Sequence, residues 1–348
     1  MVRGALGKMR WAAQRFRARF QQGALILLYH RIAEVAPDPQ RLAVTPQHFS
    51  EHLRTLKRRC HPMTLGALTR ATRDGTLPQR GIAVTFDDGY ADNLYQAKPR
   101  LENEGIPATV FVATGHLGEN REMWWDELER ILLHPGKLPD SLSLSLKGEK
   151  AVFELGRNAQ YKQRDWETNH GWNVEQSEDP SSRHRIYRSL CGFLRELDAE
   201  ERMLVLEELR VWAGAEPGAR STHRMLTVDE LLTLVKDGQF DVGAHTVSHP
   251  VLSRLTPVEQ QREIHQCKRG LEEWLGREVS SFAYPYGSRS DYTAETTRLV
   301  AGAGYESACG NFPGFVWQGN DCLQLPRLLM RDWDGESFER RLGAWFGG

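Results

Sequence analysis

Two clusters of polar residues have the types and spacing that metal-assisted hydrolysis requires. The first is the pair Asp87 and Asp88, in residues 85–89 (TFDDG), and the second is His245 and His249. Two histidines four residues apart can converge on one metal ion from a helical turn or a tight loop. One carboxylate with two imidazoles leaves coordination positions open for water and substrate. This is the arrangement of a catalytic metal rather than a structural one.

Each cluster is weak evidence by itself. An Asp-Asp-Gly sequence also forms turns and calcium-binding loops, and an H-x-x-x-H pair is common by chance. A third segment, residues 282–287 (FAYPYG), is by itself a turn that exposes backbone amides suited to stabilising an oxyanion. All three clusters directly follow apolar runs that are typical of buried strands.

The elements that must position these clusters alternate along most of the chain, which predicts a parallel α/β architecture. Buried strands are predicted at residues 24–29, 82–86, 109–113, 240–244, 281–284, 305–309 and 325–330. Helix starts are indicated by Thr45 with Pro46, by Thr227 with Glu230, and by Thr256 with Glu259. We therefore expect a single distorted (β/α) barrel, closed or incomplete, with its catalytic groups at the C-terminal ends of the strands.

The regular alternation stops between about residues 117 and 224. This region predicts a largely helical insertion that caps one face of the barrel. Trp124 and Trp125 open its first helix, and they either stack on sugar rings or belong to a core. The predicted organisation is a basic amphipathic segment, 1–23, followed by one domain, 24–348, that contains the insertion.

Composition excludes several classes of protein. Lys and Arg number 45 against 46 Asp and Glu, a net charge of -1, so no concentrated basic surface for nucleic acid is expected. No run approaches the roughly 20 apolar residues that span a bilayer, and the apolar run 24–28 has no cleavage site of a secretory signal. The five cysteines include no C-x-x-C pair and are odd in number, which favours free thiols, although Cys309 and Cys322 are close enough in sequence to meet across a hairpin. We predict a cytoplasmic protein in a reducing compartment.

The N-terminal segment 1–23 is rich in Lys and Arg and contains no acidic residue. Wound as a helix, it has one apolar face. The pattern predicts either peripheral contact with anionic lipid at the inner face of the membrane or a helix packed on the domain surface.

The ordered motifs at 85–89 (TFDDG), 245–249 (HTVSH) and 283–287 (AYPYG) resemble those of the polysaccharide deacetylase family, which is the NodB homology domain of carbohydrate esterase family 4. Residues 28–31 (LYHR) and 325–327 (LPR) are also similar to members of that family. Outside the insertion, the resemblance extends over most of the chain. It implies a distorted barrel of the polysaccharide deacetylase type.

By this resemblance, Asp87 is the general base that takes a proton from a metal-bound water. Asp88, His245 and His249 are the ligands of the metal, which in the family is most often zinc. A divalent ion lowers the pKa of its bound water and polarises the amide carbonyl, and its charge helps to keep Asp87 ionised. The backbone amide of Tyr286 corresponds to the family's oxyanion donor.

Two positions depart from the family pattern. Many relatives begin the third motif with an Arg that pairs with the base, and this chain has Ala283 there. Many also carry a late Leu-x-His whose imidazole protonates the leaving amine, and no such His follows Leu325. We hypothesise that Arg327 replaces the missing arginine and that His30, at the end of the first strand, is the general acid. A structural role for His30 at the barrel rim is the alternative.

The predicted function is metal-dependent removal of an N-acetyl group from an amino sugar in a glycan or a glycan precursor, with lipid-linked sugars among the candidates. Thr246 and Ser248, between the two histidines, are expected to orient them. The alternatives are an O-deacetylase, a hydrolase of another C–N amide bond, and a catalytically weak carbohydrate-binding module. A magnesium-dependent phosphatase would also use paired Asp but has no use for H-x-x-x-H.

Overall fold

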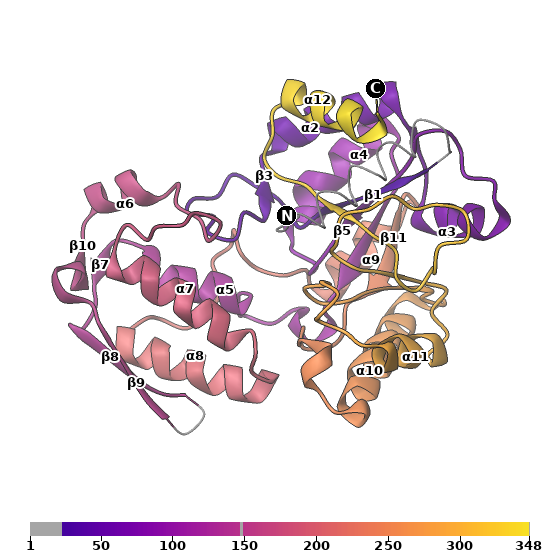
Figure 1. Cartoon of the computed structure of the whole chain (residues 1–348). Coiled ribbons are helices and arrows are strands. Elements are labelled where there is room, and N and C mark those ends of the chain that lie inside the picture. Colours follow the sequence, from indigo (N-terminus) through magenta and orange to yellow (C-terminus); the bar gives the residue numbers. More distant parts are fainter. Residues whose placement is uncertain (1–22, 147–148, 348) are drawn as a thin grey trace. The chain divides into compact units, whose positions relative to one another are not determined.

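The computed structural model describes residues 23–347, except residues 147 and 148. The described chain divides into two compact units (Figure 1). The first contains the chain up to Glu34, Leu42–Gly118 and the chain from Met225 onward, and the second contains Val35–Arg41 and Glu119–Arg224. Apart from Gly23, the predicted amphipathic segment lies outside the described residues.

The first unit is built on one parallel sheet with the strand order β13-β12-β11-β6-β5-β1-β14, and β4 pairs with β5 beside this path. Its strands are β1 (Leu25–Tyr29), β4 (His61–Pro62), β5 (Gly81–Phe86), β6 (Ala108–Val112), β11 (Phe240–Ala244), β12 (Ser281–Ala283), β13 (Ser307–Cys309) and β14 (Leu328–Leu329). Within the described residues, the end strands β13 and β14 do not pair with each other, and an isolated parallel bridge joins Cys309 of β13 to Leu325, which precedes β14. The sheet is therefore the incomplete (β/α) barrel that the sequence predicts. A separate short parallel pair joins β2 (Arg31–Ile32) to β3 (Ala43–Val44).

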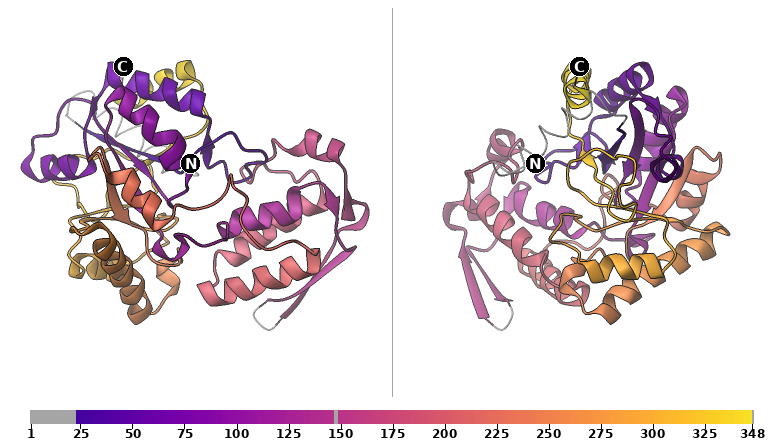
Figure 2. Two further views of the ribbon diagram at one scale, coloured as in Figure 1. Left: turned by 180° about the vertical axis from the view of Figure 1, so that it is seen from behind. Right: turned by 45° about the vertical axis from the view of Figure 1, so that its right-hand side comes forward.

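The helices of this unit pack on the sheet (Figure 2). They are α2 (Pro46–Arg59), α3 (Leu65–Asp74), the π-helix η1 (Asn93–Ala97), α4 (Lys98–Glu104), the 3₁₀ turns η2 (Thr114–His116) and η4 (Leu252–Arg254), α9 (Val228–Val235), α10 (Pro257–Leu275), α11 (Ala294–Gly302) and α12 (Gly335–Phe346). The three predicted helix starts are confirmed, because Thr45, Thr227 and Thr256 each accept a hydrogen bond from a backbone amide of the first turn.

Side-chain alternation divides each strand between two apolar clusters. Along β1, Leu25 and Leu27 join the large core beneath the helices, whereas Ile26 joins the smaller cluster on the other face of the sheet. That second cluster also contains Ala83 and Phe111. Strand side chains that point to one face of a sheet recur every two residues. Ala83, Thr85 and Asp87 therefore point to the same face of the sheet, which is the interior of the incomplete barrel.

The last predicted strand is shorter than the sequence suggests. Residues 325–330 were expected to form one strand, but only Leu328–Leu329 pairs regularly. Pro326 has no N–H to donate to a ladder, and the backbone amide of Arg327 donates to Phe312 O instead of to a neighbouring strand. Helices α3 and α12 were not predicted.

In its described residues, the second unit contains three longer helices, two short ones and two antiparallel strand pairs, β8 with β9 and β7 with β10. Its elements are α5 (Trp124–Leu133), β7 (Gly136–Lys137), β8 (Ser141–Leu146), β9 (Glu149–Glu154), η3 (Gly156–Ala159), β10 (Gln160–Tyr161), α6 (Gln163–Asn169), α7 (Ser182–Leu194) and α8 (Ala199–Ala213). The guanidinium of Arg183 is buried and donates to five backbone carbonyls, those of Leu132, His134, Gly136, Asn158 and Ala159. A buried side chain thus satisfies backbone groups of irregular segments.

Trp124 and Trp125 belong to the core of the second unit. Each is only 6% exposed, and their rings meet edge to face with centroids 5.2 Å apart. Of the two alternatives drawn from the sequence, burial is therefore the one observed. Stacking on sugar rings is wrong for this pair because neither ring presents a free face.

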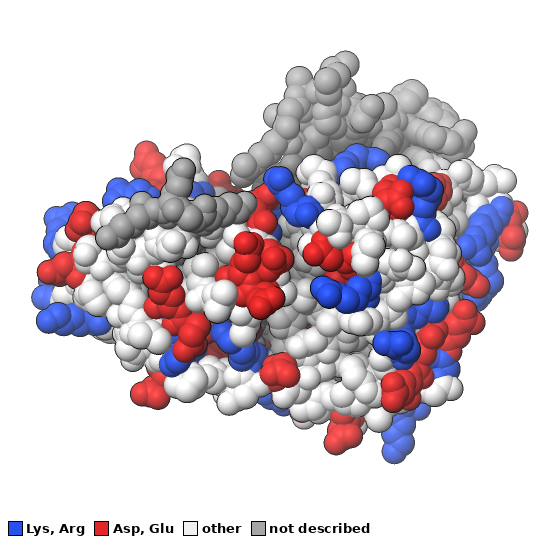
Figure 3. Space-filling model, turned by 90° about the horizontal axis from the view of Figure 1, so that it is seen from below, with Lys and Arg blue, Asp and Glu red and all other residues white. Residues whose placement is uncertain are grey.

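The surface, the helices and the thiols add three observations. On the face drawn in Figure 3, Lys and Arg side chains are interspersed with Asp and Glu rather than gathered into one basic area. Among the described residues, no helix is both long enough and apolar enough to cross a membrane. All five cysteines are free thiols, so Cys309 and Cys322 are not joined.

A buried histidine ties the first strand to the C-terminal helix. His52 Nε2 lies 2.7 Å from the carbonyl oxygen of Trp333, which requires it to carry the proton, and Nδ1 then accepts from Tyr29 Oη at 3.1 Å. The ring stacks on Phe338. Burial lowers the pKa of His52 to about 4, so the neutral ring is the form that the folded protein holds.

We expect acid to destabilise the fold through His52. Its pKa is about 4 in the folded chain and about 6.5 in an unfolded one, so its contribution is complete above pH 6.5 and is lost as the pH falls toward 4. One such group changes the free energy of unfolding by at most about 1.4 kcal/mol per pH unit in this window. The measurement is urea unfolding in the presence of a chelator at several pH values between 4 and 7.5. In the His52→Gln variant, the free energy of unfolding should fall less steeply with decreasing pH than in the wild type. His265→Gln, an exposed control on α10, should keep the wild-type slope; equal slopes for both variants would refute the role of His52.

Candidate active site

The sheet brings the predicted polar clusters to one edge. Asp87 and Asp88 follow β5, and His245 follows β11, with β6 lying between these two parallel strands. The carboxyl ends of parallel strands lie at the same edge of a sheet, so residues far apart in sequence meet there. All three side chains are buried.

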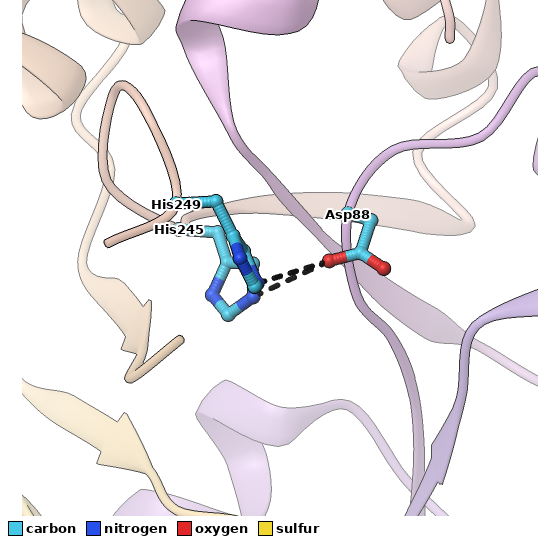
Figure 4. A group of neighbouring side chains, drawn as sticks. All are labelled: Asp88, His245 and His249. Atoms are coloured by element: carbon cyan, nitrogen blue, oxygen red, sulfur yellow. Dashed lines mark ion pairs between the residues drawn. The ribbon is translucent and has the colours of Figure 1, made fainter. Parts of the chain in front are cut away.

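Asp88, His245 and His249 form a compact group of potential metal ligands (Figure 4). The Nε2 atoms of His245 and His249 lie 3.6 and 3.4 Å from Asp88 Oδ1. Ligand atoms bound to one tetrahedral zinc ion at 2.0–2.2 Å lie roughly 3.3 Å from one another. The three side chains are therefore already spaced as ligands of one ion rather than as hydrogen-bond partners.

The protonation of His245 also suits a ligand. Its Nδ1 lies 2.7 Å from the carbonyl oxygen of Ala283, which places the proton on Nδ1 and leaves the lone pair of Nε2 directed toward Asp88. Burial lowers the pKa of His245, although the negative charge of Asp87 and the hydrogen bond to Ala283 act in the opposite direction. The donor set, its spacing and this tautomer fit a zinc-type ion.

Asp87 forms a bidentate ion pair with Arg327. Arg327 Nη1 and Nη2 lie 2.7 and 2.6 Å from Asp87 Oδ1 and Oδ2, and both side chains are almost fully buried. Burial acts to raise the pKa of Asp87, but the charge of Arg327, its hydrogen bonds and the neighbouring His245 and His30 together outweigh burial, so the pKa is lowered. The guanidinium also donates to Gly310 O and to Thr85 Oγ1. Asp87 continues the inward-facing series that Ala83 and Thr85 begin.

His30 lies beside this pair and is partly buried, with its Nδ1 atom inaccessible to solvent. Its Nδ1 has no hydrogen-bond partner among the described residues. Burial is the main cause that lowers the pKa of His30 to about 4, against the opposing charge of Asp87. The ring is therefore neutral near pH 7. The ring of Tyr286 packs edge to face on His249, with centroids 4.7 Å apart.

The backbone of the site adopts conformations that L-residues rarely occupy. Asp88, Thr246, His249 and Tyr286 have φ angles of 76°, 67°, 55° and 58°, in the left-handed region. Such residues cost free energy and persist where the surrounding structure holds them. At Asp88 this conformation interrupts the strand alternation, and the carboxylates of Asp87 and Asp88 both lie near the Nε2 atom of His245, at 3.9 and 3.6 Å.

Sequence reasoning missed one residue of this site, Glu263 of α10. Its carboxylate accepts hydrogen bonds from the backbone of Val247 and Ser248 and from the Ser248 hydroxyl. The hydroxyl of Thr246, in turn, accepts from the backbone amide of His249. An available signal was the acidic residue on the otherwise buried face of α10, one position before Ile264.

Curated proteins with similar sequences are polysaccharide deacetylases by name. The YxkH protein of Bacillus subtilis (strain 168) is 28% identical over 115 residues, which cover 31% of this chain and 38% of that protein. The poly-beta-1,6-N-acetyl-D-glucosamine N-deacetylase of Staphylococcus aureus (strain MSSA476) is 28% identical over 113 residues, 28% of this chain and 39% of that protein. The chain thus spans less than half the length of these curated relatives.

Solved structures share the fold. The deacetylase PplD of Streptococcus pyogenes, in complex with acetate, superposes with a TM-score of 0.57 at 18% identity, covering 92% of this chain and 99% of that one. IcaB from Ammonifex degensii gives the same TM-score and identity over 94% of this chain and 98% of its own. The sequence model described as polysaccharide deacetylase matches residues 74–135 and 169–308, more than half of the chain. The chain belongs to the polysaccharide deacetylase family.

Proposed function

We propose that this protein is a metal-dependent hydrolase that removes an N-acetyl group from an amino sugar. The observation that carries the proposal is a buried carboxylate, Asp87, kept ionised by Arg327 beside the ligand set of Asp88, His245 and His249. Metal-assisted amide hydrolysis needs a carboxylate base beside a metal ion whose three protein ligands leave coordination positions open for water and substrate.

The ligand set would hold a divalent ion, for which we propose zinc because two imidazoles favour it over magnesium. When bound, such an ion supplies Lewis acidity toward the carbonyl and lowers the pKa of water at the site. The remaining chemistry belongs to the protein. Asp87 accepts the proton of the attacking water, and Arg327 keeps Asp87 ionised and fixed in orientation through its two hydrogen bonds.

Two further roles belong to the proposal. The amide of Tyr286 stabilises the oxyanion, and the left-handed backbone at this residue is consistent with a specialised orientation of that amide. His30 protonates the leaving amine. Because burial lowers its pKa to about 4, His30 begins the reaction neutral; it receives the proton that Asp87 has taken from the water and donates it to the leaving amine, so Asp87 is ionised again.

The proposed substrate class is an N-acetylated amino sugar in a glycan or a glycan precursor. It is supported by the Staphylococcus aureus relatives, whose names specify poly-beta-1,6-N-acetyl-D-glucosamine. The alternatives are an O-acetylated sugar, another amide on the same scaffold, or carbohydrate binding with little turnover. A substrate panel separates them.

We expect Asp87→Asn to lower acetate release by about 10²- to 10⁴-fold, because the amide cannot accept the proton of water. The assay compares zinc-loaded wild type and variant on N-acetylated and O-acetylated sugars of one to six units. Chelation of the metal should abolish release, and added zinc should restore it.

Three results would contradict the proposal. Equal turnover by wild type and Asp87→Asn would remove Asp87 from the mechanism. Saturable binding of the oligosaccharides without any acetate release would favour the binding module, and release from O-acetylated sugars alone would favour an O-deacetylase.

The ion pair of Asp87 with Arg327 predicts a non-additive effect on stability. Arg327→Met leaves a buried carboxylate uncompensated, so the free energy of unfolding should fall by about 3–5 kcal/mol. Adding Asp87→Asn to that variant removes the unpaired charge, so the double variant should be more stable than Arg327→Met alone. Urea unfolding of the four proteins in chelator measures the cycle. Strictly additive effects would show that the pair contributes no coupling.

A further inference from the structure

The loop between the two histidine ligands is held by a carboxylate from another element. Glu263 of α10 is 7% exposed. Its Oε2 accepts hydrogen bonds from the backbone amides of Val247 at 2.8 Å and Ser248 at 2.9 Å, and its Oε1 accepts from Ser248 Oγ at 2.8 Å. One side chain therefore fixes two consecutive peptide units that lie between His245 and His249.

The same loop is held from the opposite side by backbone atoms of η2. The amides of Thr114 and Gly115 donate to the carbonyls of Thr246 and Val247, at 3.1 and 2.9 Å. A Cβ atom at Gly115 would lie 2.8 Å from Val247 O, so only glycine permits this approach. The amides of the loop thus face Glu263 and its carbonyls face η2.

Glu263 acts on this loop alone. Among the residues that the structure describes, its three hydrogen bonds all go to Val247 and Ser248, and no Lys or Arg forms an ion pair with it. Burying a carboxylate is costly unless hydrogen bonds compensate it. The loop also contains Thr246 and ends at His249, both in the left-handed region, a conformation that needs support from its surroundings.

We infer that Glu263 is a positioning residue that sets the affinity of the site for its metal ion by holding the loop 245–249 in its ligating conformation. The inference rests on the proposed metal-dependent function. A ligand pair that is already placed loses less conformational freedom on binding than a mobile pair, and changes in groups behind metal ligands typically weaken metal binding by 10- to 100-fold.

The test compares the full chain with Glu263→Gln and a matched control, Glu273→Gln, an exposed carboxylate on the same helix. Glutamine has the same size but no charge, and only one of its two terminal atoms accepts hydrogen bonds. After removal of metal, we expect calorimetric titration with Co²⁺ and Zn²⁺ to give a Kd raised about 10- to 100-fold for Glu263→Gln and unchanged for Glu273→Gln. Without metal, amide hydrogen exchange should accelerate at residues 246–249 in Glu263→Gln alone.

A Kd within twofold of wild type, with unchanged exchange at the loop, would overturn the inference. A raised Kd would also overturn it if the metal-free melting temperature fell and exchange rose throughout the first unit, because Glu263 would then be a general stabiliser. If Glu263→Gln does not fold, Glu263→Asp keeps the charge, shortens the reach and is judged by the same readouts. Failure of the wild type to bind either metal would instead refute the proposed function, and the exchange rates would still test Glu263.

Discussion

Two adjacent carboxylates at the end of a buried strand are the constraint on which the rest of this site depends. Asp87 and Asp88 are both almost inaccessible to water, and a buried carboxylate needs a compensating charge or hydrogen bonds. Arg327 compensates the first, and the second faces two imidazoles whose nitrogens are spaced as metal ligands. The left-handed backbone at Asp88 interrupts the strand geometry, and both carboxylates lie within 4 Å of His245 Nε2, at 3.9 Å for Asp87 Oδ2 and 3.6 Å for Asp88 Oδ1.

The interior of the incomplete barrel explains why Asp87 depends on the charge of Arg327. The inward-facing residues of β5 are Ala83 and Thr85, and the next in the series is Asp87 itself. Arg327 lies in that interior, over the ring of Phe111 and hydrogen-bonded to Thr85 and Gly310. An apolar cluster thus surrounds a single salt bridge, where solvent screens the interaction weakly.

Sequence reasoning predicted the elements that have strong local signals. The parallel α/β frame, the strand β11 with its observed bounds and the three capped helices follow from side-chain periodicity and capping chemistry. The Asp-Asp-Gly and H-x-x-x-H motifs could be picked out because each follows such a strand. The resemblance also suggested Arg327 as a partner for Asp87, and the structure places the two in contact across 240 positions of sequence.

What sequence could not supply depends on tertiary contacts. Glu263 looks like any acid on an amphipathic helix until the loop that it holds is in place. The shortening of β14 depends on where the amide of Arg327 finds its acceptor. Trp124 and Trp125 are apolar and aromatic whether they bind sugar or fill a core, and only their packing distinguishes the two.

The strand order has a consequence for how the chain is made. β1 and β5 precede most of the second unit in the sequence, whereas Arg327 and β14, which pairs with β1, follow it. On the ribosome, the acidic end of β5 is therefore made before its counter-charge, and most of the second unit is made between the two. The buried charge pair thus couples segments on the two sides of the second unit, and until Arg327 has been made the burial of Asp87 lacks its compensating charge.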